Sequence, residues 1–127
     1  MPAEDNKNKP GEYEGQRNKD GLRHGKGKLV YEGGDVYEGD FKTDKCHGNG
    51  TYKWVDGSEY SGCWKNDMKH GHGRYQYSSG DCYEGEFKND KCNGPGIYRF
   101  ADGSTYEGTY TLMHQPPIID KSLMNYH

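Results

Sequence analysis

One tripeptide recurs along this chain at an almost constant interval. Tyr-Glu-Gly stands at 13–15, 37–39, 83–85 and 106–108, and Tyr-Ser-Gly stands at 60–62. A second signature, His-Gly-x-Gly or Asn-Gly-Pro-Gly, keeps step with it at 24–27, 47–50, 70–73 and 93–96. Two patterns locked to one period of about 23 residues predict a stacked repeat array, in which no unit buries a core alone.

The composition by itself would suggest a disordered chain. Leu, Ile, Val and Phe together number 13 of 127 residues, and the mean hydropathy is −1.32. Twelve Tyr and two Trp supply the missing apolar area, because each such ring buries on the order of 150–250 Å². We therefore expect a thin core made of aromatic side chains.

Aromatic and glycine residues alternate with polar residues inside each unit, and this period of two is typical of a half-buried strand. In the fourth unit two such strands flank a polar segment, 88–95, which we interpret as an eight-residue hairpin loop. This register places opposite charges across the solvent face, with Glu84 opposite Arg99. It predicts three pairs on the buried face: Phe87 with Gly96, Gly85 with Tyr98, and Tyr83 with Phe100.

Successive units are joined by segments whose glycine supplies the positive φ of a tight turn. These segments are Gly33-Gly34, Asp56-Gly57, Ser79-Gly80 and Asp102-Gly103. An odd loop, of three or five residues, keeps the next Tyr on the same face, and the three-residue form places Tyr98 opposite Gly108. The sequence thus predicts an all-β antiparallel meander of β-hairpins, with about nine five-residue strands in a single elongated twisted sheet and about four and a half repeats.

The pattern divides the chain into three parts: a polar N-terminal segment 1–10, a hairpin array 11–110, and a tail 111–127 without the repeat. The first unit has one extra residue and carries Arg17 where later units carry an aromatic ring, as a capping repeat should. The tail contains Ile118 and Ile119, so we expect it to cap its own sheet or to dock into a neighbouring subunit.

Several classes of function are disfavoured by what the chain lacks. The net charge is −3 and the linear sequence has no basic stripe, so nucleic acid is not an expected partner. No apolar leader opens the chain, and we expect a cytosolic protein with four reduced cysteines. No catalytic constellation or cofactor motif is recognisable, so we predict no enzyme activity and no cofactor.

The histidines at 24, 47 and 70 invite a metal hypothesis. Equivalent positions in successive units are two strands, or about 9–10 Å, apart, whereas zinc ligands lie about 2 Å from one ion. We therefore predict no metal site, and interpret His24, His47 and His70 as loop residues that pack at the hairpin ends.

An open sheet leaves its aromatic face uncovered, and large exposed aromatic stripes usually mark interfaces. We therefore predict protein binding through this face, while a twist that closes the stripe into a private core is the alternative. Neither the partner nor self-association is decided by the sequence. The candidate contact residues are Tyr52, Trp54, Tyr60, Trp64, Tyr75, Tyr77, Phe87, Tyr98, Phe100, Tyr106, Ile118 and Ile119.

Tyr-Glu-Gly-x-Phe, a polar segment, His-Gly-x-Gly and Asp-Gly at a 23-residue period resemble the MORN repeat, the membrane occupation and recognition nexus, over residues 13–110. The stretch from Gly11 to Gly27, with Arg17 and the extra residue, resembles the radial spoke head protein 1 family of ciliary axonemes. That resemblance implies a non-enzymatic scaffold in the cytoskeleton of the cilium or flagellum, which binds other radial spoke head proteins and supports motility.

The chain has fewer repeats than we expect of that family, so a shortened paralogue or another axonemal scaffold remains an alternative. A peripheral scaffold that links anionic membrane lipid to the cytoskeleton is the second functional class. Lipid capture usually needs clusters of about four to eight Lys or Arg. The densest basic stretch, 19–28, also contains Asp20, and membrane lipid is therefore not favoured.

Overall fold

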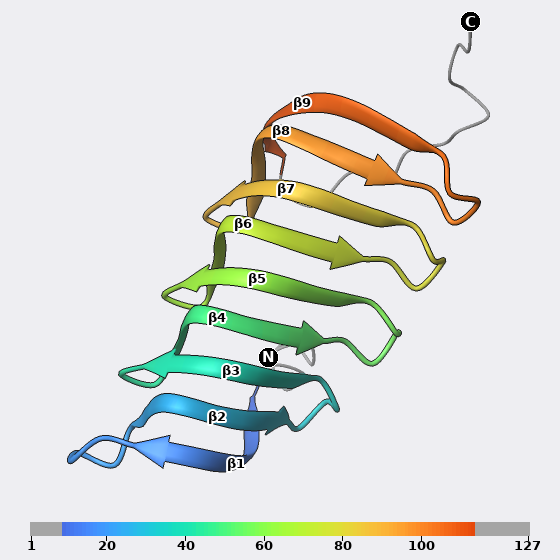
Figure 1. Ribbon diagram of the computed structural model, residues 1–127. Helices are drawn as coiled ribbons and strands as arrows, with labels where there is room; N and C mark the ends of the chain where they lie inside the picture. The colour runs from blue at the N-terminus through green and yellow to red at the C-terminus, as the bar shows by residue number, and fades with distance from the viewer. Residues whose placement is uncertain (1–8, 114–127) are drawn as a thin grey trace, which may run out of the picture.

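The computed structural model describes residues 9–113, and within that range every regular element is a strand. The strands are β1 (Pro10–Arg17), β2 (Arg23–Tyr31), β3 (Val36–Lys42), β4 (Lys45–Lys53), β5 (Glu59–Lys65), β6 (Met68–Gln76), β7 (Cys82–Lys88), β8 (Lys91–Arg99) and β9 (Thr105–Met113). They pair antiparallel in chain order in one sheet (Figure 1).

The predicted all-β meander is confirmed, with strands of seven to nine residues in place of five. β9 runs to Met113, three residues beyond the array boundary that we expected at 110. Ile118 and Ile119 lie outside the described residues.

Two kinds of turn alternate along the sheet. Within a unit, the strands are joined by two-residue turns, such as Asn89-Asp90, in which both residues have positive φ. Asn and Asp tolerate this left-handed region better than other non-glycine residues. Between units, the strands are joined by a four-residue loop at 32–35 and by five-residue loops at 54–58, 77–81 and 100–104, each with glycine at positive φ as predicted.

The predicted register is wrong by two residues in both kinds of hairpin. The segment 88–95 is not an eight-residue loop, because β8 already begins at Lys91. Tyr83 therefore faces Tyr98, and Gly85 faces Gly96. Across the loop between units, Tyr98 faces Tyr106 and Gly96 faces Gly108.

The solvent face is corrected in the same way. Glu84 lies opposite Ile97, and Glu38 lies opposite Thr51. Arg99 still reaches Glu84 diagonally, at 3.6 Å. Since a shift of two residues preserves the parity of a strand, the side chains assigned to each face were predicted correctly.

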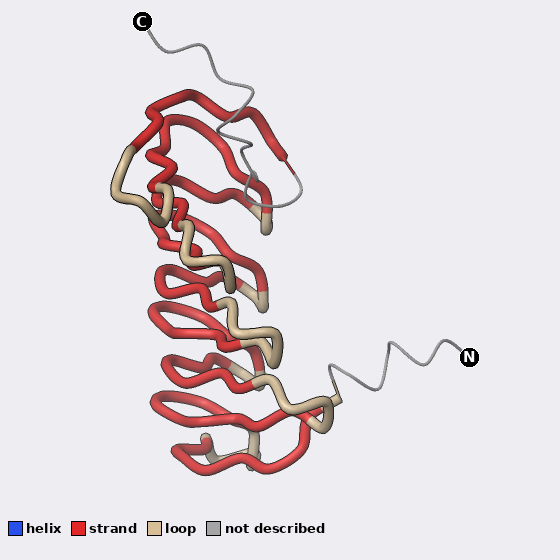
Figure 2. Tube along the Cα trace, turned by 90° about the vertical axis from the view of Figure 1, so that its right-hand side faces the viewer, coloured by secondary structure: helices blue, strands red, loops and turns tan. Residues whose placement is uncertain are grey.

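A bulge bends every complete hairpin at the same level. In the second unit the pairing passes from Gly39 with Gly50 to Phe41 with Cys46, so three residues of β4 oppose one residue of β3. The Asp40 Oδ2 atom accepts a hydrogen bond from the Asn49 amide at 2.9 Å and closes the bulge. Because extra residues on one strand bend it, each hairpin curves and the sheet becomes a trough (Figure 2).

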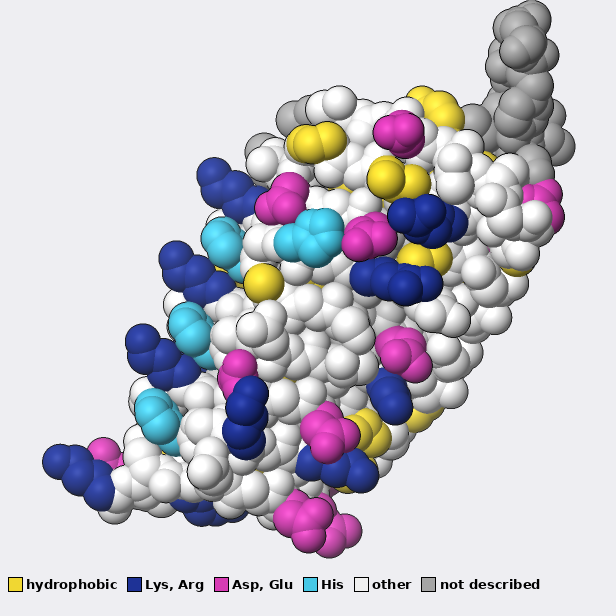
Figure 3. All heavy atoms as spheres, in the orientation of Figure 1, with side chains coloured by type: hydrophobic (Ala, Val, Ile, Leu, Met, Phe, Trp, Pro, Cys, Tyr) yellow, Lys and Arg dark blue, Asp and Glu magenta, His cyan; other side chains and the backbone are white. Residues whose placement is uncertain are grey.

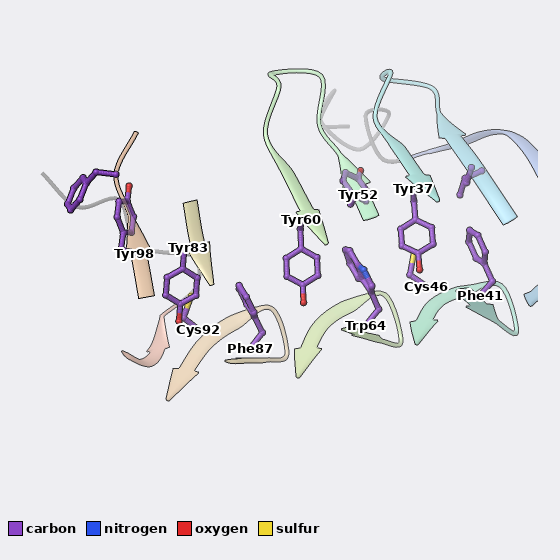
Figure 4. Close-up of a cluster of buried hydrophobic side chains, with 12 residues drawn as sticks. Tyr37, Phe41, Cys46, Tyr52, Tyr60, Trp64, Tyr83, Phe87, Cys92 and Tyr98 are labelled. Carbon is purple, nitrogen blue, oxygen red and sulfur yellow. The ribbon is translucent and has the colours of Figure 1, made fainter. Parts of the chain in front are cut away.

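Each bent hairpin thus has two arms. The turn arm leads from the bulge to the two-residue turn, as in residues 41–46. The loop arm leads from the bulge to the five-residue loop, as in residues 36–39 with 50–53. The concave space between the two arms holds the core (Figure 4).

A tyrosine ring lying over a pair of glycines is the repeated packing unit. Tyr37 is fully buried, and its hydroxyl donates to the carbonyl of Asp40 at 2.7 Å. Its ring covers Gly50 so closely that a Cβ atom there would collide with the phenol. Tyr60 covers Gly73 and Tyr83 covers Gly96 in the same manner. The expected register placed Tyr98, from the second strand of its hairpin, against Gly85 and Gly108. In the structure the ring over each of these glycine pairs comes instead from the first strand of the same hairpin, as Tyr83 does over Gly96.

These rings are linked along the array by edge-to-face contacts, with centroids 5.0–5.8 Å apart and planes at 82–89°. Rings prefer this geometry because the positive edge of one meets the negative face of the next. We call this series the inner ladder: Tyr13, Phe41, Tyr37, Trp64, Tyr60, Phe87 and Tyr83.

Two alanine variants test this packing. A Cβ atom on Gly62 would lie 2.5 Å from the Gly73 Cα and 2.6 Å from the His72 carbonyl, so backbone would have to move. We expect Gly62→Ala to lower the free energy of unfolding by about 1–3 kcal/mol in a urea titration. Gly108→Ala is the matched control, because the Cβ there meets only the Tyr106 ring, at 3.1 Å. The control should stay within about 1 kcal/mol of the parent, and equal losses in both variants would contradict the packing.

Candidate functional site

A groove of about 390 Å³ opens between the two arms of the trough. Its loop-arm wall includes Tyr31 and Trp54, and its turn-arm wall includes Asp44 and Lys69. Phe41, Cys46 and Trp64 are among the residues at its floor. One wall is therefore aromatic and the other is charged, so the groove is amphipathic in cross-section.

The aromatic wall is a second continuous series of rings, with centroids 4.5–5.8 Å apart and planes tilted by 34–57°. Tyr31, Trp54, Tyr75 and Tyr77 are half-buried and pack against the core. We call this series the outer ladder: Tyr31, Tyr52, Trp54, Tyr75, Tyr77, Tyr98 and Phe100.

Two aspartates hold rings of the outer ladder in position through hydrogen bonds. Asp35 is fully buried, and its carboxylate accepts hydrogen bonds from the Tyr52 hydroxyl at 2.8 Å and the Val55 amide at 2.9 Å. Asp81 accepts from the Tyr98 hydroxyl and the Ala101 amide at the same two distances. Both residues follow a loop glycine, and sequence reasoning treated these segments only as turns. The recurrence of Gly-Asp 17 residues before a Tyr was the available clue.

The charged wall is built by the aspartates of the two-residue turns. The Asp67 amide donates to the Cys46 carbonyl at 2.9 Å, and its carboxylate accepts from the Cys46 amide at 2.8 Å. Asp90 forms the same two hydrogen bonds with the backbone of Lys69, so each of these turns is bound to the unit before it. The Asp44 carboxylate meets the Arg23 guanidinium at 2.7 Å, and this hydrogen bond lowers the pKa of Asp44.

The Lys69 side chain extends from the charged wall toward the aromatic wall. The Lys69 Nζ lies 5.6 Å from the Trp54 ring centroid and 5.7 Å from that of Tyr60. Both distances are within the range of a cation–π interaction. Lys69 therefore bridges the two walls at the level of the third unit. The side chains of both walls are thus ordered in the protein without a partner.

The predicted contact residues fall into three groups. Six have almost no surface of their own: Tyr52, Tyr60, Trp64, Phe87, Tyr98 and Phe100. The expectation of an exposed stripe is wrong for these six, because the bent strands close over them. Trp54, Tyr75 and Tyr77 lie together in the outer ladder, and Tyr106 is 41% exposed on β9. Their role in partner binding stays a prediction.

The histidines do not occupy hairpin loops. His24, His47 and His70 lie inside β2, β4 and β6, because the turns are shorter than predicted. The His24 Nδ1 atom accepts a hydrogen bond from the Thr43 amide at 3.1 Å, which ties a strand to the next turn. Among residues 9–113, no group of three or more His, Cys, Asp or Glu is arranged to hold a metal ion. In the same range, no helix has the length and apolar character to cross a membrane.

The repeats of this chain match a known family of repeat proteins. The family model of the MORN repeat matches four consecutive segments, 19–36, 37–59, 60–82 and 83–105. The chain belongs to the MORN-repeat family. The segments meet where each Tyr of the inner ladder begins a new unit, at Tyr37, Tyr60 and Tyr83, so the sequence repeat and the packing repeat share one frame.

One curated protein is similar over part of the chain. It is named inactive protein tyrosine kinase pTKL, from Plasmodium berghei (strain Anka), and is 40% identical over 55 residues. The alignment covers 43% of this chain but 4% of that protein. The similarity therefore concerns a short stretch of a much longer protein. MORN repeats in general serve as scaffold or binding modules, not as catalysts.

The four cysteines are free thiols, and their positions predict different reactivities. Burial and the neighbouring Asp67 carboxylate raise the pKa of the Cys46 thiol to about 12, and burial raises the pKa of Cys92 to about 11. The reactive species is the thiolate. We expect iodoacetamide at neutral pH to alkylate the half-buried Cys63 first, as read by peptide mass spectrometry. Labelling of Cys46 or Cys92 should require urea, and early labelling of either in the folded protein would contradict this core.

Proposed function

We propose that this MORN-repeat protein is a non-enzymatic scaffold that holds a polypeptide segment of a partner protein in its groove. The observation that carries the proposal is that Tyr31 and Trp54, the half-buried rings of the outer ladder that line the 390 Å³ groove, stand opposite a wall of fixed charges. Tyr and Trp are enriched at protein interfaces because they offer large apolar area together with a polar atom. Their pre-arrangement lowers the ordering cost of binding.

An amphipathic segment fits this cross-section. Its apolar side chains would lie on Tyr31 and Trp54, which are half-buried, pack against the core and line the groove. Its polar side chains would meet the turn-arm wall, where Lys69 and Asp44 stand. A ligand of this kind uses both walls at once, whereas a purely apolar ligand would displace water from the ion pairs of Asp44 and Lys69 without replacing its hydrogen bonds.

We further propose that the partner belongs to the radial spoke head of a ciliary or flagellar axoneme, where the chain would support motility. This rests on the resemblance of Gly11–Gly27. The first unit also differs in geometry from the later units. Arg17 replaces the aromatic residue of later units, and its guanidinium lies over the Tyr13 ring at 4.8 Å. The unusual residues of this stretch thus form a specific N-terminal cap, which a generic MORN unit does not need.

A tagged copy expressed in a ciliated cell tests both statements. We expect it to line the axoneme, to remain after detergent extraction, and to co-purify with spoke head proteins. Loss of the label with detergent would instead indicate a membrane-bound scaffold, and co-purification with other cytoskeletal proteins alone would reject the spoke assignment.

Two variants test the groove itself. Trp54→Ala removes part of the aromatic wall, and Lys69→Glu reverses the bridging charge. We expect each to weaken retention of the partner at least tenfold, or about 1.4 kcal/mol, in quantitative pull-downs. Lys53→Glu is the matched charge control, because Lys53 is exposed on the outer face. Melting curves of all variants identify any loss that comes from unfolding. A partner retained equally by folded Lys69→Glu and by Lys53→Glu would place the interface elsewhere.

A further inference from the structure

Charge is segregated between the two long edges of the array. The two-residue turns with their flanking residues, and the longer first turn, occupy 17–23, 42–45, 65–68 and 88–91, and they contain eight Lys or Arg and four Asp, a formal charge of +4. The loops between units, 32–35, 54–58, 77–81 and 100–104, contain five Asp or Glu and neither Lys nor Arg. The whole chain carries −3, so its turn edge is opposite in sign to the rest of the molecule.

Six positive side chains of this edge are exposed, whereas three of its four aspartates accept hydrogen bonds from backbone amides. Arg17, Lys19, Lys42, Lys45, Lys65 and Lys88 are exposed. The turn aspartates accept hydrogen bonds from the backbone of the preceding unit, as Asp67 does from Cys46. Figure 3 shows the result as a column of Lys and Arg side chains along one edge, interspersed with His.

The outer face of the sheet behaves differently. There Lys26 pairs with Asp40, Arg99 with Glu84, and His72 with both Glu84 and Glu86. Within residues 9–113, the salt bridges include none made by Lys42, Lys65 or Lys88. These charges of the outer face are paired within the sheet, and Lys28 and Lys53 are also exposed there, whereas the turn edge presents a regular row of lysines to solvent.

The spacing of this row suits an extended polypeptide. Equivalent lysines are two strands apart, or about 9.6 Å at about 4.8 Å per strand. In the polyproline II form of an extended chain, three residues make one turn and advance about 9.3 Å, which is close to one repeat of the array. An acidic residue at every third position of such a chain would lie on one side of it and would meet successive lysines.

Other polyanions fit this edge less well. Duplex DNA carries a charge about every 1.7 Å, far denser than this row, and residues 42–45, 65–68 and 88–91 include no aromatic ring on which a base could stack. An anionic lipid surface has no fixed spacing of charge along one line, so it would make no use of the regular repeat of this row.

We propose that the turn edge is a docking surface for an extended acidic segment of a partner protein, with acidic side chains at about every third residue. The turn edge adjoins the groove through Asp44, Asp67 and Asp90, but the three lysines on which the proposal rests, Lys42, Lys65 and Lys88, are not among the groove-lining residues. The inference does not depend on the proposed groove function, and its variants leave the groove walls intact.

The full chain and a labelled peptide of six Glu-Ser-Ser repeats test the surface by fluorescence anisotropy. We expect binding that weakens steeply between about 50 and 500 mM salt, since exposed charges are screened over that range. The triple variant Lys42→Gln/Lys65→Gln/Lys88→Gln should bind at least tenfold more weakly. The matched control, Lys28→Gln/Lys53→Gln/Arg99→Gln, removes three exposed charges from the outer face and should bind within about twofold of the parent.

Further outcomes decide against the proposal. Equal losses in the two triples would show a general effect of net charge. Affinity that is independent of salt would exclude an electrostatic surface. Two further probes are vesicles of phosphatidylcholine with phosphatidylserine and a single-stranded oligonucleotide. If either binds more tightly than the peptide, and binds the Lys42/Lys65/Lys88 triple variant more weakly than the parent, the edge is a lipid or nucleic-acid site instead. A change of sedimentation coefficient confined to that triple would assign it to contact between copies. Circular dichroism of both triples checks that they fold.

Discussion

The arrangement depends on one contact, a tyrosine ring lying flat over two paired glycines. Only glycine leaves room for a phenol this close to the backbone, and the ring in turn fills the space that two missing side chains leave. Tyr37, Tyr60 and Tyr83 are each fully buried in this way. The contact explains why a chain with few aliphatic residues has a core. A ring that lies along the sheet covers more backbone than a side chain that stands upright, so a single layer of rings is enough.

Bending of the hairpins converts this layer into an interior. The bulge at Asp40 and Asn49, and its counterparts in later units, raise the turn arm toward the loop arm. Phe41, Trp64 and Phe87 are thereby brought against the tyrosines of the loop arm (Figure 4). A flat sheet of the same sequence would expose both sets of rings. The groove is what remains open between the arms, and its aromatic wall is the outer margin of the same core.

The sequence was sufficient for the repeat, the strand faces and the glycine loops, because these follow from period and parity. It was insufficient for register. Asn89-Asp90 contains no glycine, so the segment around it was interpreted as a long loop, although both residues adopt positive φ in a two-residue turn. The bulges were missed for a related reason: His47-Gly48-Asn49 resembles turn chemistry, and nothing local shows that it lies opposite a strand. For the candidate site, Trp54, Tyr75 and Tyr77 were identified correctly as members of one aromatic row. Their burial, and the supporting roles of Asp35 and Asp81, required the fold.

The hydrogen bonds of each turn aspartate to the preceding unit give the array a direction. Asp44, Asp67 and Asp90 each bind the backbone of the unit that precedes them, and the first unit closes its own end with Arg17 over Tyr13. A 23-residue module inserted between two units would bring its own turn aspartate and would offer the same backbone groups to the unit that follows it. Internal duplication could therefore lengthen the array in steps of about 9.6 Å, and the size of the recognised segment becomes a quantity that evolution can adjust by copying.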